Sequence, residues 1–441
     1  MKAYSISVIT GGRLIGENCE VKRFVTDSRQ VEEGDVFVAL KGQKHDGHSF
    51  VEEAFRRGAV GVVVEREVPV KEGKFALVVE DSLKALRSIA LFKRNNFKGK
   101  VVGIAGSAGK TTTKELVAHL LSAVGKVCKT PKNYNSQIGV PLSVANFPED
   151  CDFWVIEMGA SAKGDVAKLT QLVIPHVRVI TSIGEEHLET FGCLDDVILG
   201  NGEILEGMRE DHVAVLPSYV AHCYRVERAV LFGEGTPLSA QDLKLTVEGV
   251  RFVVKGKEIF LPVPSLALVE NILCSLGVME ALGVDWTTLL DKLTTFRPVE
   301  GRFRTLSVMG ATIIDDSYNA NPLSVKKAIE SLSLMEGHRI AVLGDMLELG
   351  EKAEELHRDV GRWCAEKRID ECIFYGYWMR YAFHEAKRLG VSTIYLEDKG
   401  EVVQHLRKKL REGTIILVKG SRGMKMEEVI TQLLQEHGVV F

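Results

Sequence analysis

The sequence predicts an α/β protein built from three domains. Short apolar runs alternate with segments of helical pattern along the whole chain, which is typical of α/β folds. The 441 residues are too many for one hydrophobic core and indicate about three domains. A strand, a glycine loop and a helix follow one another just after residue 100, and a new series of strands begins at residue 312. We therefore expect domains over residues 1–97, 98–296 and 297–441.

The first section contains two strand-like apolar runs, 36–40 and 60–64, with a helical segment between them at 50–57. A polar and basic break at 93–100 precedes the next strand, and this break places the first domain boundary near residue 98.

The middle section opens with a strand at 101–105, followed by a loop and a helix. The helix carries one apolar stripe and stops at Gly125; the stripe consists of Leu116, Val117, Leu120, Leu121 and Val124. Further strands are expected at 153–156 and 177–180, and a helix over 266–282 closes the section. The third section has strands at 312–314, 340–344 and 415–418 with helices between them, which predicts a smaller, doubly wound, Rossmann-like sheet.

Composition excludes several classes of protein. The net charge of −4 gives no general attraction to nucleic acid or to an anionic membrane. No apolar run approaches the roughly 18 residues that span a bilayer, and the N-terminus lacks a signal-peptide pattern, so we expect a cytoplasmic protein. The eight cysteines contain no CxxC pair, which indicates neither a zinc site nor a disulfide framework. We expect reduced, mostly buried thiols.

The clearest functional motif is a glycine loop between the predicted strand at 101–105 and the following helix. It consists of Gly106, Ser107, Ala108, Gly109, Lys110, Thr111 and Thr112. Glycine lets the backbone approach phosphates closely, and a helix N-terminus favours their negative charge. Lys110 can reach the β- and γ-phosphates of ATP, and the Thr111 hydroxyl can bind magnesium. The common pattern has a further glycine where Ile104 stands, and the alternative is a glycine turn with an incidental lysine.

The shortened GxxGKTT loop resembles that of the Mur ligases and the related folylpolyglutamate synthetases. Residues 26–29, 34–40 and 46–48 resemble the uridine-nucleotide domain of Mur ligases, and 132–141 resembles their asparagine-rich loop. Residues 155–160 and 184–189 resemble their two metal-binding segments. The resemblance covers essentially the whole chain. It implies an N-terminal uridine-nucleotide-binding α/β domain, a central P-loop ATPase-like domain with a parallel sheet, and a Rossmann-like C-terminal domain.

The resemblance also implies site residues. Those expected at the UDP end of the substrate are Ser28, Arg29, Asp46, His48, Asn133 and Asn135. Asn271 is expected beside adenine and Arg302 beside phosphate, in addition to the loop. Lys110, Glu157 and His187 are the expected catalytic residues, and Glu157 and His187 join Thr111 as metal ligands. The alternatives are a simple turn at Asp46 and His48, a structural histidine at 187, an N-cap or salt bridge at Glu157, and a solvated charge at Arg302.

Motifs in the third section resemble those of the family member that adds D-alanyl-D-alanine. They are 315–322, 343–350 with His357, and 418–422. The member that adds the third amino acid usually has a DNPR motif and a Tyr-Ala-His segment, and both are absent from this sequence. The implied substrates are UDP-N-acetylmuramoyl-tripeptide and D-alanyl-D-alanine, with Asp316, Asn319 and Asn321 on the dipeptide side. We expect a monomer that binds neither nucleic acid nor membrane.

The implied mechanism activates a carboxylate, which is a poor acyl donor by itself. ATP transfers its γ-phosphoryl group to the carboxylate, and the amine of the dipeptide then attacks and expels phosphate through a tetrahedral intermediate. Both steps build charge on oxygen atoms, so catalysis should depend on positioning and electrostatic stabilisation. Because the expected groups come from three domains, domain closure is expected to assemble the site.

Two departures from the family pattern affect the expected site. Most Mur ligases carry a carbamylated lysine near the second metal, and Asn201 stands at that position here. An asparagine amide is neutral, so we expect either a weaker second magnesium or compensation by Glu185, Glu186 or Glu203. The helix at 266–282 has Ala267-Leu268 where the family usually has His-Asn, which leaves Asn271 of the usual adenine pattern.

Three rival interpretations remain: the ligase that adds the third residue, a folylpolyglutamate synthetase, and a nucleotide-binding regulator with the ligase fold and no chemistry. The third-section motifs argue against the first and the uridine-domain motifs against the second. Asn201 favours the regulator, whereas Lys110, Thr111, Glu157 and His187 oppose it.

Overall fold

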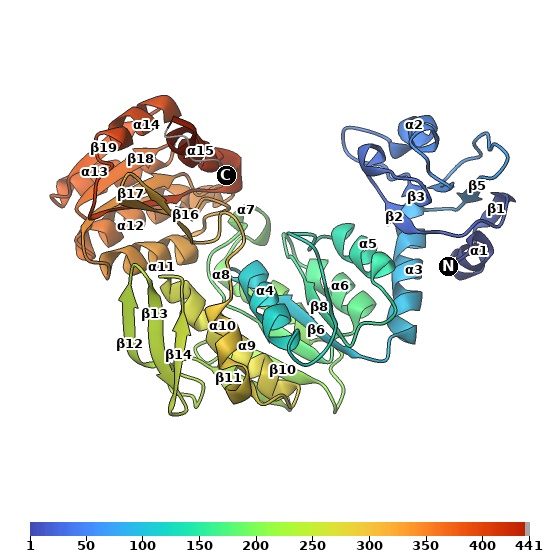
Figure 1. Ribbon diagram of the computed structural model, residues 1–441, viewed down its shortest axis with the longest axis horizontal. Coiled ribbons are helices and arrows are strands. Elements are labelled where there is room, and N and C mark those ends of the chain that lie inside the picture. The colour runs from blue at the N-terminus through green and yellow to red at the C-terminus, as the bar shows by residue number, and fades with distance from the viewer. Residues whose placement is uncertain (437–441) are drawn as a thin grey trace. The chain divides into compact units, whose positions relative to one another are not determined.

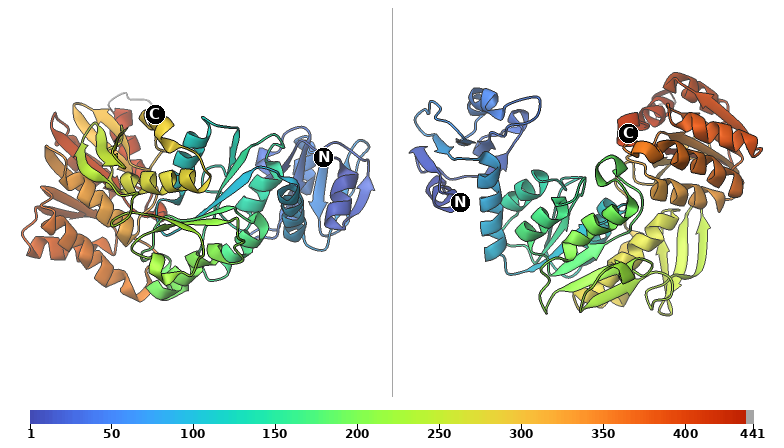
Figure 2. Two further views of the ribbon diagram at one scale, coloured as in Figure 1. Left: turned by 90° about the horizontal axis from the view of Figure 1, so that it is seen from below. Right: turned by 180° about the vertical axis from the view of Figure 1, so that it is seen from behind.

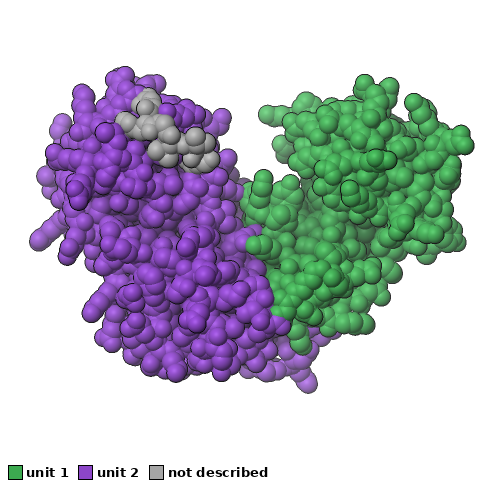
Figure 3. All heavy atoms as spheres, in the orientation of Figure 1, with its two compact units in different colours: residues 1–103, 125–158, 168–175 green, residues 104–124, 159–167, 176–441 purple. Residues whose placement is uncertain are grey.

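The computed structural model describes residues 1–436, and Figure 1 shows its helices and strands in chain order. Two compact units can be distinguished (Figure 3). Unit 1 comprises residues 1–103, 125–158 and 168–175, and unit 2 comprises residues 104–124, 159–167 and 176 onward. The division falls inside strand β6 (Lys100–Ala105). The domain boundaries at residues 97 and 296 remain predictions.

Unit 1 contains a five-stranded sheet in the order β1-β5-β4-β3-β2, in which only β1 runs antiparallel to its neighbour. Its elements are α1 (Ala3–Thr10), β1 (Arg13–Gly16), β2 (Arg23–Val25), β3 (Asp35–Val38), α2 (Val51–Arg56), β4 (Gly61–Val64), β5 (Phe75–Val78) and α3 (Ser82–Asn96). All residues of β3 and β4 are buried, as expected for parallel strands covered on both faces. The predicted strands at 36–40 and 60–64 and the helix at 50–57 are confirmed within a few residues.

The central sheet has the order β11-β10-β9-β6-β8-β7. Its strands are β6, β7 (Val127–Lys129), β8 (Phe153–Glu157), β9 (Val177–Ile180), β10 (Val213–Pro217) and β11 (Ala229–Phe232). The helices of this part of the chain are α4 (Lys110–Leu121), α5 (Gly139–Asn146), α6 (Asp165–Val173), α7 (Leu188–Phe191), α8 (Leu194–Gly202), α9 (Leu266–Ala281) and α10 (Leu290–Thr294). The predicted strands at 153–156 and 177–180 and the helix at 266–282 are confirmed.

Helix α4 ends earlier than expected, because the sequence predicts a helix with Val124 in its apolar stripe and Gly125 as its stop. The helix ends at Leu121, and Val124 lies outside it with 48% of its surface exposed. Backbone N–H groups of Ser122 and Val124 bond to carbonyls of the last turn, which closes the helix before Gly125 is reached. Val124 therefore does not belong to the buried stripe.

A three-stranded antiparallel sheet follows the central strands and is not among the expected elements. It consists of β12 (Gln241–Thr246), β13 (Gly249–Val254) and β14 (Lys257–Leu261). Five of the six β12 residues are exposed, so this strand lacks the apolar run that indicates a strand in sequence.

The C-terminal sheet has the order β15-β16-β20-β17-β18-β19, and all its neighbours are parallel except β15 and β16. Its strands are β15 (Arg304–Val308), β16 (Ala311–Asp316), β17 (His338–Gly344), β18 (Glu371–Tyr375), β19 (Thr393–Leu396) and β20 (Thr414–Lys419). Its helices are α11 (Pro322–Ser333), α12 (Ala353–Glu366), α13 (Met379–Arg388), α14 (Lys399–Arg407) and α15 (Glu427–Glu436). Helices α14 and α15 pack on one face around a core that includes Val342, Val403 and Leu433, and α11, α12 and α13 cover the other face (Figures 1 and 2). The Rossmann-like layering is confirmed.

The expectation of reduced cysteines is wrong for two residues, because Cys128 and Cys151 form a disulfide. Strand β7 pairs with β8 so that Cys128 lies opposite Trp154, and this brings it beside the segment that precedes β8. The 23-residue separation hides this proximity in the sequence. The other six cysteines are free. Within residues 1–436, no helix combines the length and apolar character that crossing a bilayer requires.

Candidate nucleotide and substrate sites

The glycine loop at 106–109 connects β6 to α4 and is held against the segment that follows β9. The Ser107 N–H donates to the Ser182 carbonyl over 2.8 Å, and the Ala108 N–H donates to the Ser182 hydroxyl over 3.0 Å. Gly106 has a φ of +136°, and a Cβ there would lie 2.1 Å from Thr181 Oγ1. Only glycine fits this close approach. Thr181 and Ser182 are not among the predicted site residues, although they follow a predicted parallel strand at the edge where such sheets gather ligands.

Lys110 begins α4 and turns back over the loop. Its Nζ donates to the Gly106 carbonyl over 2.6 Å, and Gly109, with a φ of +79°, is the N-cap residue. The first N–H groups of this 12-residue helix have no partner within the helix, and the helix dipole makes this end positive. Loop, lysine and helix end together form a site for anionic phosphate groups.

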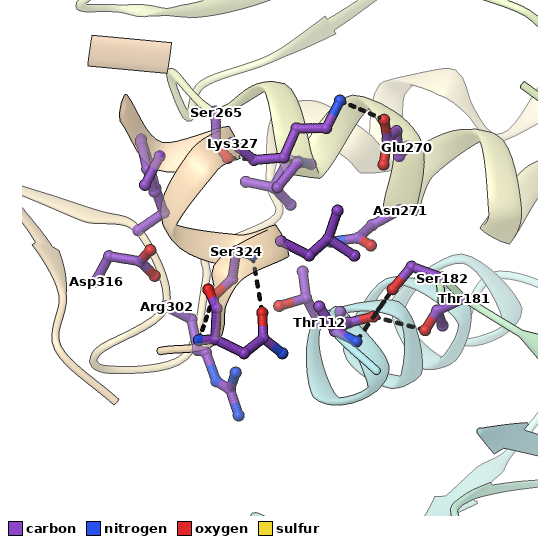
Figure 4. A pocket seen from close by; sticks show the side chains of 18 of the residues that line it. Thr112, Thr181, Ser182, Ser265, Glu270, Asn271, Arg302, Asp316, Ser324 and Lys327 are labelled. Atoms are coloured by element: carbon purple, nitrogen blue, oxygen red, sulfur yellow. Dashed lines mark hydrogen bonds and ion pairs between the residues drawn. The ribbon is translucent and has the colours of Figure 1, made fainter. Parts of the chain in front are cut away.

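A cavity of about 110 Å³ lies beside the loop, and Figure 4 shows the side chains around it. Thr112 comes from α4, Asn271 from α9, and Ser324 and Lys327 from α11. The Thr113 hydroxyl donates to Asn271 Oδ1 over 3.4 Å. Ala267 and Leu268, which stand in place of the family's usual His-Asn, also line the cavity.

Arg302 lies between the loop helix and an aromatic ring. Its Nη2 donates to Thr111 Oγ1 over 3.3 Å, and its guanidinium lies over the Tyr318 ring, 4.1 Å from the centroid. The structure therefore places Arg302 beside the phosphate loop, and its contact with a phosphate group stays a prediction.

The three residues expected on the dipeptide side also line this cavity: Asp316, Asn319 and Asn321. Asn321 caps α11 and donates through Nδ2 to the Ser107 carbonyl over 3.1 Å, so it contacts the phosphate loop directly. Lys419 Nζ donates to Asp316 Oδ2 over 2.7 Å and to the Asn319 carbonyl over 2.9 Å. Burial raises the pKa of the Asp316 carboxyl above its usual range, although the Lys419 ammonium opposes the shift.

A second cavity, of about 340 Å³, has acidic and basic side chains in its wall. The acidic ones are Glu186 and Glu348, the basic one is Arg422, and His187 lies there as well. Asn319 and Asn321 line it as well. His187 Nδ1 lies 2.9 Å from Glu348 Oε2, and both residues have positive φ, +43° and +63°. Positive φ is uncommon for residues other than glycine and concentrates at functional sites.

The candidates to compensate for Asn201 differ in their surroundings. Glu203 accepts N–H groups of Gly164 and Ala167 at 2.6 and 2.9 Å and thereby serves the start of α6. Glu186 is 6% exposed and accepts from Asn201 Nδ2 over 3.1 Å. Asn201 is completely buried and also accepts the Gly106 N–H. Glu186 is therefore the carboxylate that Asn201 connects to the loop.

Glu157 lies in unit 1, at the end of β8. Its carboxylate accepts from Asn135 Nδ2 over 2.9 Å, and its N–H donates to the Thr130 hydroxyl over 3.0 Å. The glutamate is 1% exposed. The asparagine-rich loop and the expected metal-binding segment thus meet within this unit.

A cavity of about 730 Å³ lies in unit 1. Its wall comes from the β2 region and the asparagine-rich loop with α5, and includes Asp27, Lys129, Asn133, Tyr134 and Asn146. Of the six residues expected at the UDP end, only Asn133 lines this cavity. Lys129 and Asn146 are missed by the sequence analysis, although they lie within a few residues of the loop at 132–141.

The other expected UDP residues have partners of their own. Ser28 Oγ donates to Glu53 over 3.2 Å, and Arg29 pairs with Asp27 over 2.8 Å. His48 is buried; its Nδ1 lies 2.6 Å from Asp46 Oδ1, and its Nε2 accepts the Glu65 N–H over 2.8 Å. Both ring nitrogens of His48 therefore hold the loop around it together.

Magnesium bound to a nucleotide needs few protein ligands, because phosphate oxygens and water complete its octahedron. Within residues 1–436 no three His, Cys, Asp or Glu side chains gather into a metal cluster. Thr111, at the start of α4, is 5% exposed, and its hydroxyl is a metal ligand of the right kind. These residues fit a magnesium–nucleotide complex better than an ion held by protein alone.

Comparison with known proteins gives consistent matches along the chain. Models of the Mur ligase family catalytic domain, the Mur ligase middle domain and the Mur ligase glutamate ligase domain match residues 20–95, 104–279 and 301–422. The UDP-N-acetylmuramoyl-tripeptide–D-alanyl-D-alanine ligase of Bacillus subtilis (strain 168) is 33% identical over 434 residues, covering 95% of this chain and 94% of the relative. A crystal structure of MurF from Acinetobacter baumannii has a TM-score of 0.90 at 29% identity, with 98% of each chain covered. MurF ligase from Thermotoga maritima in complex with ADP has a TM-score of 0.84 at 32% identity, covering 96% of this chain and 99% of that one.

Proposed function

Because this chain belongs to the Mur ligase family, we propose that it joins D-alanyl-D-alanine to UDP-N-acetylmuramoyl-tripeptide using ATP. The observation that carries the proposal is the phosphate loop, in which Lys110 folds over Gly106 at the N-terminus of α4. The Thermotoga maritima relative with the same fold was solved with ADP, which supports nucleotide binding at this loop. The enzyme would take part in the cytoplasmic synthesis of peptidoglycan precursors, and we expect it to act as a monomer.

The residues of the loop act on the nucleotide. Lys110 and the N–H groups at the start of α4 hold the β- and γ-phosphates. Arg302 lies beside the loop, where it can contact the γ-phosphoryl group during its transfer. Magnesium, held by the Thr111 hydroxyl and phosphate oxygens, would neutralise part of the developing negative charge. Asn271 and the small side chain of Ala267 leave room on the adenine side.

The reaction is a phosphoryl transfer followed by an acyl transfer. The terminal carboxylate of the tripeptide attacks the γ-phosphorus of ATP, and ADP leaves. The amine of the dipeptide then attacks the acyl carbon; the C–N bond forms, the amine loses a proton and inorganic phosphate departs. The protein contributes positioned donors for the oxygen atoms that gain charge in both steps.

The cavity of about 340 Å³ suits a zwitterionic dipeptide. Its Glu186 and Glu348 carboxylates favour an ammonium group, and its Arg422 guanidinium favours a carboxylate, for which the planar fork can form two hydrogen bonds. Asn319 and Asn321, which line this cavity and the one beside the phosphate loop, would contact the dipeptide near the reacting carbonyl. Of these two cavities, Asp316 lines the one beside the phosphate loop, where it pairs with Lys419.

The cavity of about 730 Å³ in unit 1 would hold the UDP end of the other substrate. Lys129 and Arg23 can meet the diphosphate, and Asn133 offers an amide group for uracil or ribose. Glu157 and His187 are the residues that we propose for contact with a second magnesium.

The test measures ATP-dependent phosphate release with UDP-N-acetylmuramoyl-tripeptide, with and without D-alanyl-D-alanine. Release that needs both substrates and yields a UDP-pentapeptide supports the proposal. Lys110→Ala should reduce turnover by about 100-fold or more, as removal of one charge-stabilising donor does elsewhere. Lys408→Ala, at an exposed position, is the control and should leave turnover unchanged.

Two other results would contradict the proposal. Turnover with a UDP-dipeptide and a diamino acid, but none with the tripeptide, would assign the chain to the addition of the third residue. Nucleotide binding without turnover of any acceptor would support the regulator.

A further inference from the structure

Asn201 lies near the end of α8 and connects two parts of unit 2 that are far apart in sequence. Its Oδ1 accepts the Gly106 N–H over 2.9 Å. Its Nδ2 donates to Glu186 Oε1 over 3.1 Å and to the Val197 carbonyl over 3.2 Å. The residue is 0% exposed, so water does not compete for these bonds.

The partners fix the orientation of the amide. A backbone N–H only donates, so the oxygen must face Gly106. A carboxylate and a carbonyl oxygen both accept, so the amide nitrogen must face Glu186 and Val197. A carboxylate at this position would lack the donor, and an aliphatic side chain would lack both groups.

The two ends of this bridge reach different cavities. Gly106 opens the phosphate loop, whose residues 107–109 line the cavity beside α4. Glu186 is 6% exposed and lines the cavity of about 340 Å³. The Asn201 amide therefore fixes the position of a buried carboxylate relative to the backbone that receives phosphate.

We propose that Asn201 is a positioning residue: through its amide it holds the phosphate loop and the Glu186 carboxylate in one arrangement on which nucleotide affinity depends. The proposal deepens the proposed function and rests on nucleotide binding at the loop. It assigns a role to the one position where this chain replaces the expected lysine by a neutral side chain. Nucleotide affinity should depend on the hydrogen-bonding character of residues 201 and 186: one side chain must donate and the other must accept.

The test measures binding of magnesium-ADP by calorimetry to the full chain and to four variants. Asn201→Ala removes all three side-chain bonds and should weaken binding about tenfold, the effect of losing a bond to a buried partner. Asn201→Asp places two carboxylates together and should weaken it at least as much. Glu186→Gln should change affinity less than threefold, because the new amide oxygen still accepts from Asn201 Nδ2.

The fourth variant combines Asn201→Asp with Glu186→Gln. The introduced carboxylate can accept from Gly106 as before and from the introduced amide, so the bond between residues 201 and 186 returns with donor and acceptor exchanged and with the same net charge. The bond to the Val197 carbonyl does not return. We expect affinity within about threefold of the parent. A merely space-filling role predicts no such rescue. Leu199→Ala, on the same helix and 61% exposed, is the control for general damage to α8.

Unfolding temperatures of all variants show whether each remains folded. A folded Asn201→Asp variant with parental affinity overturns the proposal, and so does a folded double variant that binds no better than Asn201→Asp alone. Because the assay needs no acceptor substrate, it is separate from the ligase test. Parental binding of magnesium-ADP without ligase turnover would contradict the proposed function and leave this inference intact.

Discussion

The side-chain amide of Asn146 makes both hydrogen bonds that a neighbouring strand would make with Phe24. Its Oδ1 accepts the Phe24 N–H over 2.8 Å, and its Nδ2 donates to the Phe24 carbonyl over 2.8 Å. Strand β2 is the edge of the five-stranded sheet, and the amide of a residue from α5 thus completes its pairing. Both residues line the cavity of about 730 Å³.

Replacing Asn146 by alanine should therefore loosen β2 and the wall of that cavity. Two hydrogen bonds are lost and the backbone groups of Phe24 need new partners, so unfolding should become easier by about 1–3 kcal/mol. Urea unfolding followed by circular dichroism measures this change. Asn96→Ala, at an exposed helix end, is the control. If Asn146→Ala unfolds at the same urea concentration as the parent, the paired amide does not stabilise the sheet.

Gly109→Ala should abolish nucleotide binding because the new methyl group would clash with Asn271. Gly413→Ala, which creates no such clash, is the matched control. Its φ is +79°, and the new Cβ would lie 2.4 Å from Asn271 Oδ1. Gly413 has a φ of +78° with nothing within 4 Å, so Gly413→Ala reports the backbone cost alone, about 1–2 kcal/mol of stability. Calorimetry with magnesium-ADP and urea unfolding separate the two effects. Equal nucleotide affinities in the two variants would show that the close approach of Asn271 does not matter.

The stability of the protein should fall below neutral pH because of His357. The ring is completely buried, its Nε2 accepts the Met346 N–H over 3.0 Å, and burial lowers its pKa from 6.5 to about 4. Between these values the unfolded imidazole binds a proton that the folded one does not, so the free energy of unfolding falls as pH drops from 6.5 to about 4. The loss should approach about 3 kcal/mol.

Urea unfolding at several pH values between 7.5 and 4 measures this dependence. His357→Gln, which does not titrate, should be less stable at pH 7.5 and should lose that part of the pH dependence. A variant with the full pH dependence of the parent would show that other groups cause it.

Lys419 and Asp316 form an ion pair whose partners depend on each other. Lys419 is 3% exposed, so Lys419→Met should cost about 3–5 kcal/mol by leaving a carboxylate unpaired in a buried site. Asp316→Asn combined with Lys419→Met should recover part of this loss, because no unpaired charge remains. A double-mutant cycle of urea unfolding gives the coupling energy. Additive effects of the two changes would mean that the pair contributes no net coupling.

Much of the fold could be predicted because the signals are local. Strand β4 and most of β3 and β17 appear as continuous apolar runs, and the stripe of α4 has helical spacing. Strand β12 could not be predicted, since five of its six residues are exposed and its pairing partner decides its conformation. The same holds for Asn146, whose partner Phe24 lies 122 residues away.

The phosphate loop belongs to what the sequence by itself determined. Glycines at 106 and 109, followed by Lys110 and Thr111, have requirements of backbone angle, charge and helix position that are set within a few residues. The sequence could not assign Asn201 or choose among Glu185, Glu186 and Glu203. Only the tertiary structure decided that Glu203 serves α6 while Asn201 joins Glu186 to Gly106. The reason is that a hydrogen bond depends on distance and direction in space, and a loop 95 residues away supplies the partner.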